Sequence, residues 1–265
     1  MKPKVSIIMG IYNCSATIEE AVDSILKQTY ENWKLIMCDD GSTDDTYNIA
    51  LSYSKRYPDK MVLIQNSLNQ GLNITLNHCL EYADTEYIAR MDGDDISLPR
   101  RIEAEVEFLD SHPEYAIVSS PMVYFDEAGV WKTGKEHGEP TEKDIAKGTP
   151  FCHAPCMVRK EAYDAVDGYS EDEKLLRVED YDLWIKMLSK GYKGYNLSEP
   201  LYMVRDDRNA ISRRKFKYRI NEARVQKKAI KELCLPFKYY LYVLKPLLVG
   251  MLPIKTYEYL RKKKR

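Results

Sequence analysis

The first half of the chain alternates short apolar runs with longer stretches of helical periodicity. Continuous apolar runs of this kind are typical of strands buried on both faces of a parallel sheet, and they occur at residues 5–12, 33–39, 61–65 and 87–91. Helical stretches follow them at residues 15–28, 42–57, 71–83 and 98–112. This alternation predicts β-α-β units with right-handed crossovers, and hence an α/β fold with a mostly parallel sheet flanked by helices.

Particular residues predict where two of these helices begin. Ser15 is placed to cap the first helix, and Pro99 is expected in the first turn of the fourth. The first helix has an apolar face made of Ile18, Ala21, Val22, Ile25 and Leu26.

The second half of the chain is less regular. Residues 115–131 predict a strand and a hairpin that turns near residues 127–129, and residues 181–191 predict a short helix ended by Gly191. Two strand-like pieces follow, at 192–197 and 200–205, and residues 213–233 predict a basic helix. Because no internal repeat or low-complexity linker is present, we expect one domain, residues 1–212, and an appendage, residues 213–265.

The amino-acid composition indicates which class of protein the chain belongs to. Apolar residues at 44% and charged residues at 31% are ordinary for a soluble globular chain. The six cysteines are scattered, which predicts reduced thiols in a cytosolic protein rather than a disulfide framework. Cys152 and Cys156 lack a second pair at zinc-site spacing, so we do not expect a structural metal there. The polar residues 1–4 lead directly into the first strand, and we expect no signal peptide.

Charge is distributed unevenly along the chain. The net charge is −1, but residues 213–265 hold 17 Lys or Arg against 3 Asp or Glu. The remaining residues are therefore acidic overall, and an acidic body with a basic tail indicates two functional surfaces.

Carboxylates gather where the predicted strands end. Asp39 and Asp40 follow the second strand, and Asp92, Asp94 and Asp95 follow the fourth. Parallel α/β sheets bind ligands at this edge, but neither a dinucleotide fingerprint nor a phosphate loop is present. Close carboxylates repel one another unless a positive charge compensates. A Mg²⁺ or Mn²⁺ ion that carries a diphosphate would supply it, so the sequence predicts a metal–diphosphate site.

Both acidic segments also have a purely structural interpretation. The stretch DDGSTDD could be a turn that leads into a helix, with Gly41 at a positive φ. The stretch DGDD could be a solvated loop, and an isolated Asp-x-Asp occurs often by chance. Two acidic clusters at the ends of two strands of one sheet favour the ligand site.

Several spaced motifs together resemble the family 2 glycosyltransferases. They are SIIMGIYNCSATIEEAVDSILKQTYENWKLIMCDDGSTDDT, RMDGDD and HAPCMVRKEAYDAVDGYSEDEKLLRVEDYDLWIKML, and the likeness covers roughly residues 4–210. The resemblance implies the GT-A nucleotide-sugar fold, which is Rossmann-like. It also implies inverting transfer from a nucleotide-diphosphate sugar, with UDP favoured, to a glycan hydroxyl. The bacterial enzymes of capsule, exopolysaccharide or lipopolysaccharide synthesis are the most similar in kind, and their acceptors suggest a lipid-linked oligosaccharide.

The resemblance also implies roles for the acidic residues. Tyr12 and Asp39 would line the pocket for the base and ribose, with Asp40 close by. Asp92 would lie near the ribose and share the metal, Mn²⁺ or Mg²⁺, with Asp94 as its main ligand. Two departures blur the nucleotide contacts: residues 10–11 are Gly-Ile where many members have Pro-Thr, and an Arg often found before NSLNQGLNITLN is absent.

The segment VEDYDLW would supply the base. The resemblance makes Asp180 the general base, with Glu179 assisting it or orienting the acceptor. From the residues alone, Asp180 could simply cap the helix at 181–190. Leu183 and Trp184 are expected in the core of that helix.

His153 and four arginines can each be interpreted in two ways. His153 could touch the acceptor or the diphosphate, or could be a buried histidine with its hydrogen bonds satisfied. A second set could pair with a pyrophosphate or form a solvated basic face: Arg205, Arg208, Arg213 and Arg214.

The closing stretch predicts a membrane-interface segment. Lys245, Pro246 and Pro253 interrupt its apolar part, so it is too short to span a bilayer. Its aromatic residues and the terminal RKKKR fit an anionic lipid surface, although a helix packed back on the domain is the alternative. No nucleic-acid motif accompanies the basic residues, and we expect no nucleic-acid partner. The sequence thus predicts a peripheral enzyme on the cytoplasmic face of the cell membrane, with a nucleotidyltransferase or a non-catalytic binding module as competing interpretations.

Overall fold

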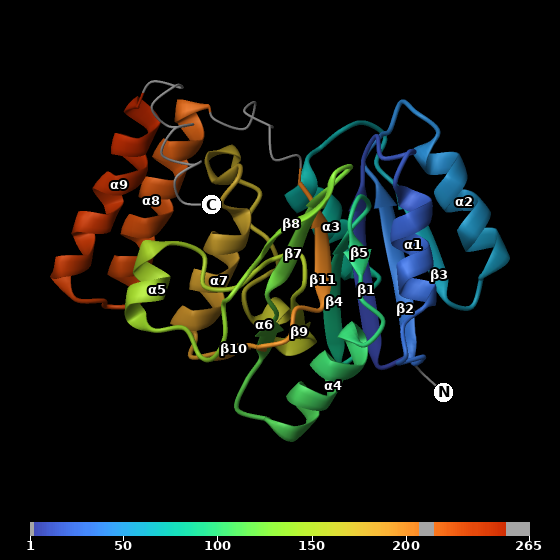
Figure 1. Ribbon diagram of the computed structural model, residues 1–265, viewed down its shortest axis with the longest axis horizontal. Helices are drawn as coiled ribbons and strands as arrows, with labels where there is room; N and C mark the ends of the chain where they lie inside the picture. Colours follow the sequence, from blue (N-terminus) through green and yellow to red (C-terminus); the bar gives the residue numbers. More distant parts are fainter. Residues whose placement is uncertain (1–2, 207–214, 253–265) are drawn as a thin grey trace.

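The computed structural model describes residues 3–206 and 215–252, which form two β-sheets flanked by helices (Figure 1). The larger sheet has seven strands in the order β10-β6-β9-β4-β1-β2-β3. The four predicted strands are confirmed as β1 to β4. They form one side of this sheet and pair with one another in parallel. Their bounds are β1 Val5–Ile11, β2 Trp33–Asp39, β3 Met61–Gln65 and β4 Tyr87–Asp92.

Three short strands extend this sheet beyond β4. β9 (Met157–Arg159) runs antiparallel to both β4 and β6 (Ile117–Ser119), and β10 (Gly194–Asn196) pairs in parallel with β6. The prediction of a mostly parallel sheet is confirmed. The antiparallel β9 was missed because three residues carry too little pattern to separate a strand from a loop.

A second sheet has four strands. Its order is β5-β11-β7-β8, with bounds β5 Ile96–Ser97, β7 Met122–Asp126, β8 Gly129–Thr133 and β11 Tyr202–Arg205. The predicted hairpin is confirmed as β7 and β8, which are antiparallel. β11 pairs with β5, and this places residues 202–203 beside the segment that follows β4.

The helices of the first half follow the predicted pattern with shifted ends. Their bounds are α1 Ile18–Leu26, α2 Thr46–Arg56, α3 Leu72–Glu81 and α4 Arg101–Ser111. The cap prediction for Ser15 is wrong, because α1 begins after Thr17, whose hydroxyl donates to the carbonyl of Gly93 (3.0 Å). Pro99 precedes α4 rather than lying in its first turn. The start of α1 is thus fixed by the acidic segment after β4.

The central strands β1, β2 and β4 of the large sheet are buried on both faces. Alternate side chains of β1 and β2 point to opposite sides. One side packs with α1, α2 and α4 and includes Ile7 and Leu35; the other packs with α3 and α7 and includes Ile8 and Ile36. Trp184 is fully buried on the second side, as predicted, and Leu183 with it.

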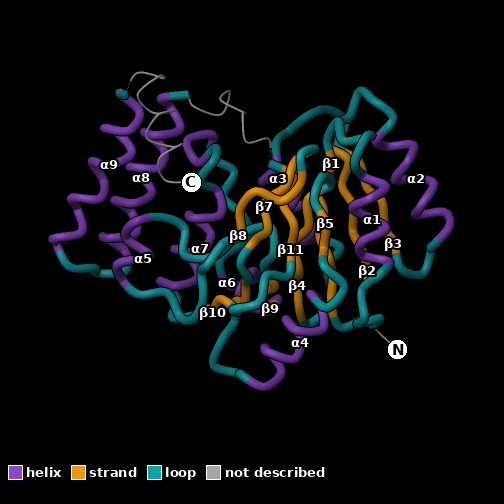
Figure 2. The backbone as a smooth tube through the Cα atoms, viewed as in Figure 1, coloured by secondary structure: helices purple, strands orange, loops and turns teal. Residues whose placement is uncertain are grey.

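The second half contributes a group of helices at one end of the molecule, on the left in Figures 1 and 2. The predicted helix at 181–191 is α7 (Glu179–Ser189), and the basic helix is α8 (Phe216–Glu232). The sequence did not predict the short α5 and α6. The remaining bounds are α5 Glu142–Lys147, α6 Lys160–Ala165, η1 Glu173–Leu175, η2 Phe237–Tyr239 and α9 Tyr240–Met251.

The basic helix α8 packs on the body of the protein. Lys228 donates to the buried carboxylate of Asp182 on α7 (2.6 Å), and the buried Gln226 donates to the carbonyl of Lys147 on α5 (2.8 Å). α9 in turn lies along α8 (Figure 1). Within residues 3–206 and 215–252, no helix combines the length and apolar character needed to cross a membrane.

Candidate active site

The predicted acidic residues meet at the carboxyl ends of three neighbouring strands. β1 lies between β2 and β4, and its last residues pair in register with both acidic strand ends. Ile11 is opposite Asp39 of β2, and Gly10 is opposite Asp92 of β4. The prediction that segments distant in the sequence share one edge of the sheet is therefore confirmed.

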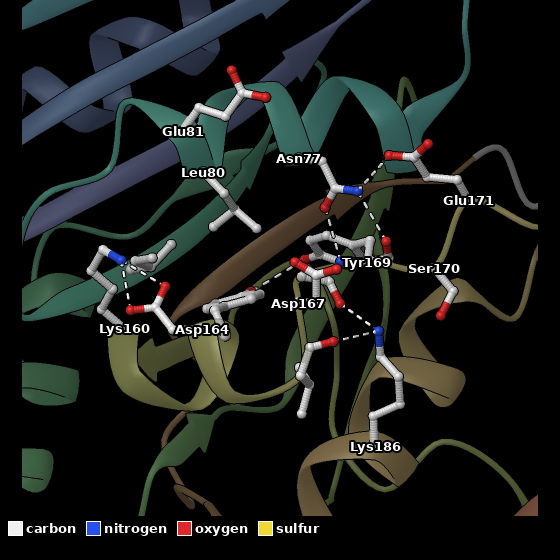
Figure 3. Close-up of a pocket in the computed structure, with 14 residues that line it drawn as sticks. Asn77, Leu80, Glu81, Lys160, Asp164, Asp167, Tyr169, Ser170, Glu171 and Lys186 are labelled. Carbon is white, nitrogen blue, oxygen red and sulfur yellow. Dashed lines mark hydrogen bonds and ion pairs between the residues drawn. The ribbon is translucent and has the colours of Figure 1, made fainter.

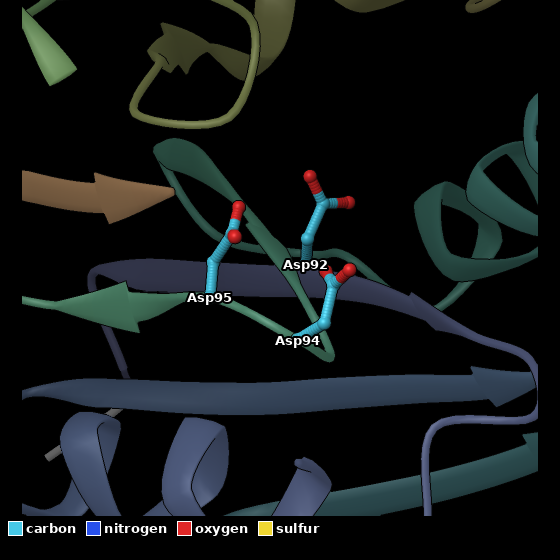
Figure 4. Close-up of side chains that lie close together, drawn as sticks. All are labelled: Asp92, Asp94 and Asp95. Carbon is cyan, nitrogen blue, oxygen red and sulfur yellow. The ribbon is translucent and has the colours of Figure 1, made fainter. Parts of the chain in front are cut away.

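Asp92, Asp94 and Asp95 form a compact group on the turn after β4 (Figure 4). One carboxylate oxygen of each lies within 4.8 Å of the others. Asp95 is buried, Asp92 is partly buried and Asp94 is exposed. Hard oxygen donors at this spacing, open to solvent on one side, fit a Mg²⁺ or Mn²⁺ ion that also binds a phosphate. Asp95 belongs to the group although the sequence analysis gave it no role.

A buried arginine supplies part of the positive charge that these carboxylates need. Arg90 lies two residues before Asp92 on the same face of β4, and its Nη2 is 2.5 Å from Asp92 Oδ1. Burial alone would lower the pKa of Arg90, but Asp92 and neighbouring phenol and thiol groups raise it, so the guanidinium stays charged. Its Nε has no hydrogen-bond partner among the described residues. Sequence analysis missed Arg90, although a charged residue inside the apolar run YIARM was a visible signal.

Arg205 of β11 holds the acidic turn in shape. Its backbone N–H donates to Asp95 Oδ1 (2.8 Å), and its guanidinium donates to the carbonyl of Asp94 (3.1 Å) and to Glu20 (2.5 Å). Burial, followed by the charges of Asp92 and Asp94, raises the pKa of Asp95 to about 8. Arg205 is therefore engaged within the protein. Arg208, Arg213 and Arg214 lie outside the described residues.

Asp39 and Asp40 are both buried but differ in what they can still bind. Asp39 Oδ2 accepts from the N–H of Ser42 (3.2 Å) and from Gln65 Nε2 (3.0 Å), whereas Oδ1 is buried without a partner in the described part of the chain. Such an orphaned oxygen, at the same edge of the sheet as Asp92, is available to accept a hydrogen bond from a ligand. Tyr12 stands at the rim with 47% of its surface exposed.

Asp40 is committed to the fold instead. Its two oxygens accept from Asn66 Nδ2 (2.8 Å) and from the N–H groups of Gln70 (2.8 Å) and Gly71 (2.9 Å). The turn that follows needs Gly41, whose φ is +71° and whose added Cβ would lie 2.8 Å from the backbone of Leu68. The structural interpretation of DDGSTDD, a turn with Gly41 at a positive φ, is confirmed. It does not exclude a ligand role for Asp39, which ends β2 just before this turn.

Asp180 lies in the first turn of α7, immediately after Glu179. The prediction that Asp180 caps this helix is wrong, because α7 begins at Glu179 and its N-cap residue is Val178. Asp180 keeps some exposed surface, yet desolvation by its surroundings, followed by the charge of Glu179, raises its pKa to about 6. The N–H of Tyr181 and the charge of Arg90 oppose this shift. A carboxylate with a pKa near neutrality is suited to accept a proton at physiological pH.

Arg90 and His153 connect the acidic turn with Asp180. The charge of Arg90 acts on Asp92, on Asp180 and on His153, so these groups share one electrostatic environment. Burial and then Arg90 lower the pKa of His153 well below its usual value, and its Nε2 is 2.8 Å from the hydroxyl of Tyr169. His153 is thus a neutral histidine with a hydrogen-bond partner, which was one of its two interpretations.

One cavity lies away from this chemistry. It has a volume of about 620 Å³ and lies between α3, α6 and the start of the loop before α7 (Figure 3). Both of its lysines are already paired: Lys160 with Asp164 (2.6 Å), and Lys186 with the carbonyls of Val166 (3.0 Å) and Gly168 (2.6 Å). No acidic strand end lines it. The candidate site therefore rests on the residues at the strand ends, where charges and an orphaned oxygen converge.

Comparison with known proteins gives a consistent result. The sequence model of the family described as Glycosyl transferase family 2 matches residues 6–167, more than half of the chain. A curated relative, the putative glycosyltransferase EpsE of Bacillus subtilis (strain 168), is 47% identical over 262 residues, which cover 99% of this chain and 94% of the relative.

Two more distant proteins extend the comparison. UDP-Glc:alpha-D-GlcNAc-diphosphoundecaprenol beta-1,3-glucosyltransferase WfaP of Escherichia coli is 31% identical over 223 residues, covering 84% of this chain and 85% of WfaP. The solved structure of mannosyltransferase PcManGT from Pyrobaculum calidifontis, in complex with GDP-Man and Mn²⁺, matches with a TM-score of 0.64 at 20% identity, covering 94% of this chain and 69% of that one.

Proposed function

The chain belongs to glycosyl transferase family 2 and is a glycosyltransferase, and on that premise we propose how it works. It moves a sugar from a nucleotide-diphosphate donor, with UDP favoured, to a hydroxyl of a glycan acceptor in cell-surface polysaccharide synthesis. The reaction inverts the anomeric carbon. The observation that carries this proposal is the arrangement around Arg90, with an oxygen-rich acidic turn on one side and Asp180, whose pKa is raised toward neutrality, on the other.

The donor end of the site uses the strand ends. Asp94 and Asp92 hold the divalent cation, which when bound stabilises the negative charge on the departing diphosphate. Asp39 Oδ1 accepts a hydrogen bond from the nucleoside, and Tyr12 covers it from the rim. Asp40 supports the nucleoside pocket from behind, through the turn that it holds.

The acceptor end uses α7. Asp180 takes the proton of the acceptor hydroxyl as its oxygen bonds to the anomeric carbon and the bond to the diphosphate breaks. One base and one leaving group suit a single in-line displacement with inversion, and no covalent sugar–protein intermediate is needed. Glu179, whose Oε2 is buried without a partner among the described residues, orients the acceptor.

The name of WfaP states a diphosphoundecaprenol acceptor, and we propose a lipid-linked acceptor for this chain as well. The competing interpretations fit less well. A nucleotidyltransferase would release pyrophosphate from a nucleoside triphosphate, and a non-catalytic module would have no use for Asp180. We propose residues 1–212 as the catalytic unit and residues 213–265 as an appendage, with α8 docked on the unit.

A thermal-shift panel tests the donor site. UDP, dTDP, GDP, CMP and ATP are each added with Mn²⁺, Mg²⁺ or EDTA, because a ligand that binds only the folded state raises Tm by mass action. We expect one nucleoside diphosphate to raise Tm with metal and to lose that effect in EDTA. Asp94→Asn should abolish the metal-dependent part, whereas Asp84→Asn, at an exposed position in the loop between α3 and β4, should keep it. If no nucleoside diphosphate shifts Tm under any condition, the donor proposal fails.

The exposed face of α9 is the part of the appendage that we propose to meet an anionic membrane surface. Leu241, Leu244, Leu248 and Met251 follow helical spacing and expose 52–72% of their surface, and Phe237 exposes 84%. An apolar stripe of this kind on a folded protein marks an interaction surface. Lys245 lies within the stripe and Lys238 before it, and six of residues 253–265 are Lys or Arg. This positive charge complements anionic lipid.

Vesicle binding tests the proposed face. Leu244→Asp with Leu248→Asp should reduce flotation with vesicles rich in phosphatidylglycerol by about tenfold or more, because each buried leucine contributes about 1.5–3 kcal/mol. The control is Val130→Asp on β8, which removes a similarly exposed apolar side chain elsewhere. Deletion of residues 236–265 should release the protein to the soluble fraction. Undiminished flotation of the double variant would show that another surface binds the lipid.

A further inference from the structure

A second cavity is distinct from the acidic strand ends, and Thr149, whose side chain acts on Asp180, lines it. It has a volume of about 410 Å³ and lies between the segment 135–140 that follows β8, the end of α5 and β10. This volume is within the range of about 300–1,000 Å³ that small-molecule sites occupy. Two backbone hydrogen bonds between Gly138 and Asn196 (2.8 and 3.0 Å) join the segment to β10, so the cavity wall is held in place.

Thr149 connects this cavity to the proposed base. The residue lines the cavity and is exposed, and its side chain lowers the pKa of the Asp180 carboxyl. Its hydroxyl donates to the carbonyl of Phe151 (3.1 Å). Because a hydroxyl can rotate, it can turn from this carbonyl toward Asp180 or toward a bound molecule. A ligand in this cavity would therefore lie next to the group that takes the proton from the acceptor.

Asn196 indicates that the cavity is built for a hydrogen-bonding ligand. The residue is 4% exposed and lines the cavity, and its Nδ2 donates to the carbonyl of Pro150 (3.1 Å). Its Oδ1 is buried and finds no donor within the described ranges. Leaving such an oxygen unpaired costs about 1–3 kcal/mol. A donor on a bound molecule, such as a sugar hydroxyl, would remove that cost.

The charges that line the cavity favour a neutral ligand. Lys135 and Lys147 are outnumbered by Glu136, Glu139 and Asp144. A phosphate group would meet this excess of negative charge without a metal site to offset it, because the acidic strand ends do not line the cavity. The mixture of donors and acceptors instead suits a neutral molecule rich in hydroxyl groups.

We propose that this cavity is a subsite for a neutral sugar residue of the acceptor, adjacent to the residue whose hydroxyl reacts. The proposal rests on the proposed glycosyl transfer and names the part of the acceptor that this chain recognises. Asn196 Oδ1 accepts a sugar hydroxyl, and Thr149 relays the position of the bound sugar to Asp180.

Gly148 offers a direct way to fill the cavity. It lines the wall with φ 166°, an extended backbone that any residue adopts, and a Cβ placed on it would have no atom within 4 Å. Gly148→Leu should therefore occupy the space without backbone strain. Gly148→Ala adds only one methyl group and should give a smaller effect. Lys143→Leu is the matched control, because it adds the same side chain to an exposed position of α5 outside the cavity.

Saturation-transfer NMR with UDP and Mg²⁺ measures the binding of methyl glycosides of glucose, galactose, N-acetylglucosamine and rhamnose. We expect at least one to bind the unsubstituted protein and the Lys143→Leu control, and its affinity to fall about tenfold or more, roughly 1.4 kcal/mol, in Gly148→Leu. If Gly148→Leu does not melt like the unsubstituted protein, Gly148→Ala decides, with a loss of about twofold expected. The absence of glycoside binding, or binding that both Gly148 variants retain, overturns the proposal.

The same protein samples keep this inference separate from the proposed function. Hydrolysis of the nucleotide sugar by water needs the donor site and the base but no acceptor sugar, so it should be unchanged in Gly148→Leu. If hydrolysis and nucleotide binding are present while the glycosides do not bind, only the subsite fails. If the unsubstituted protein neither binds nor hydrolyses any nucleotide sugar, the proposed function itself fails.

Discussion

Asp180→Asn is expected to lower the rate of sugar transfer by roughly 10²–10⁴-fold, the usual contribution of a positioned general base. Asparagine has nearly the same shape but cannot take the proton of the acceptor hydroxyl. Nucleotide binding with Mg²⁺ should be retained, because the donor groups lie at or just after the ends of β1, β2 and β4 rather than on α7. The single-turnover rate and the UDP-dependent thermal shift, measured on the same variant, separate these two effects.

The raised pKa of Asp180 gives this prediction a pH dependence. In the unsubstituted protein kcat/KM should fall as pH drops below about 6, because the carboxyl becomes protonated. Its ordinary pKa is 3.8, so between the two values the folded protein binds more protons than the unfolded chain, and Asp180 lowers stability as pH rises through this window. Asp180→Asn should therefore have a higher Tm than the unsubstituted protein at pH 7.5, and this difference should vanish toward pH 4.

A matched substitution shows whether the effect belongs to Asp180. Asp182→Asn changes the next carboxylate along α7, which binds Lys228 and Ser170. It should lower Tm, because it weakens the docking of α8, and should leave the acid limb of the pH profile in place. An Asp180→Asn variant that transfers sugar at the unsubstituted rate would remove this residue from the proposed role of base.

How far the sequence predicts this site depends on how local each signal is. The first four strands have clear apolar runs, and their alternation with helices is sufficient to place Asp39 at the end of β2 and Asp92 at the end of β4, on one edge of the sheet. The short β9, in contrast, exists only because β4 and β6 flank it on both sides. Such a strand is defined by tertiary pairing and leaves no pattern of its own.

Roles of individual residues were harder to predict because they depend on partners far along the chain. Asp40 lies beside Asp39, yet its bonds to Asn66, Gln70 and Gly71 make it part of a turn. Ser15 was predicted to cap α1, but the helix begins after Thr17, whose hydroxyl donates to the carbonyl of Gly93, 76 residues away. Asx and Thr side chains have several local and distant options, and only the assembled fold selects among them.

Arg90→Met is expected to be strongly destabilising and to make stability depend on metal. Breaking a buried ion pair by removing one partner costs about 3–5 kcal/mol, and here Asp92, Asp94 and Asp95 would be left without the guanidinium. Tm in EDTA should fall by roughly 5–15 °C. Because a divalent cation in the acidic turn supplies positive charge to the same carboxylates, Mg²⁺ or Mn²⁺ should restore part of this loss. The control is Arg100→Met, whose exposed pair with Glu103 is worth about 0–1 kcal/mol.

Arg90→Met should also change the pH dependence of activity. The charge of Arg90 lowers the pKa of Asp180, so its removal should move the acid limb of kcat/KM to higher pH, in addition to any weakening of donor binding. A variant with the unsubstituted Tm in EDTA and an unshifted acid limb would show that Arg90 balances neither group. With both effects present, the positive charge that the acidic turn requires has two sources. One is the bound metal, and the other is a side chain of the same strand, which also holds the base and the metal site in one electrostatic unit.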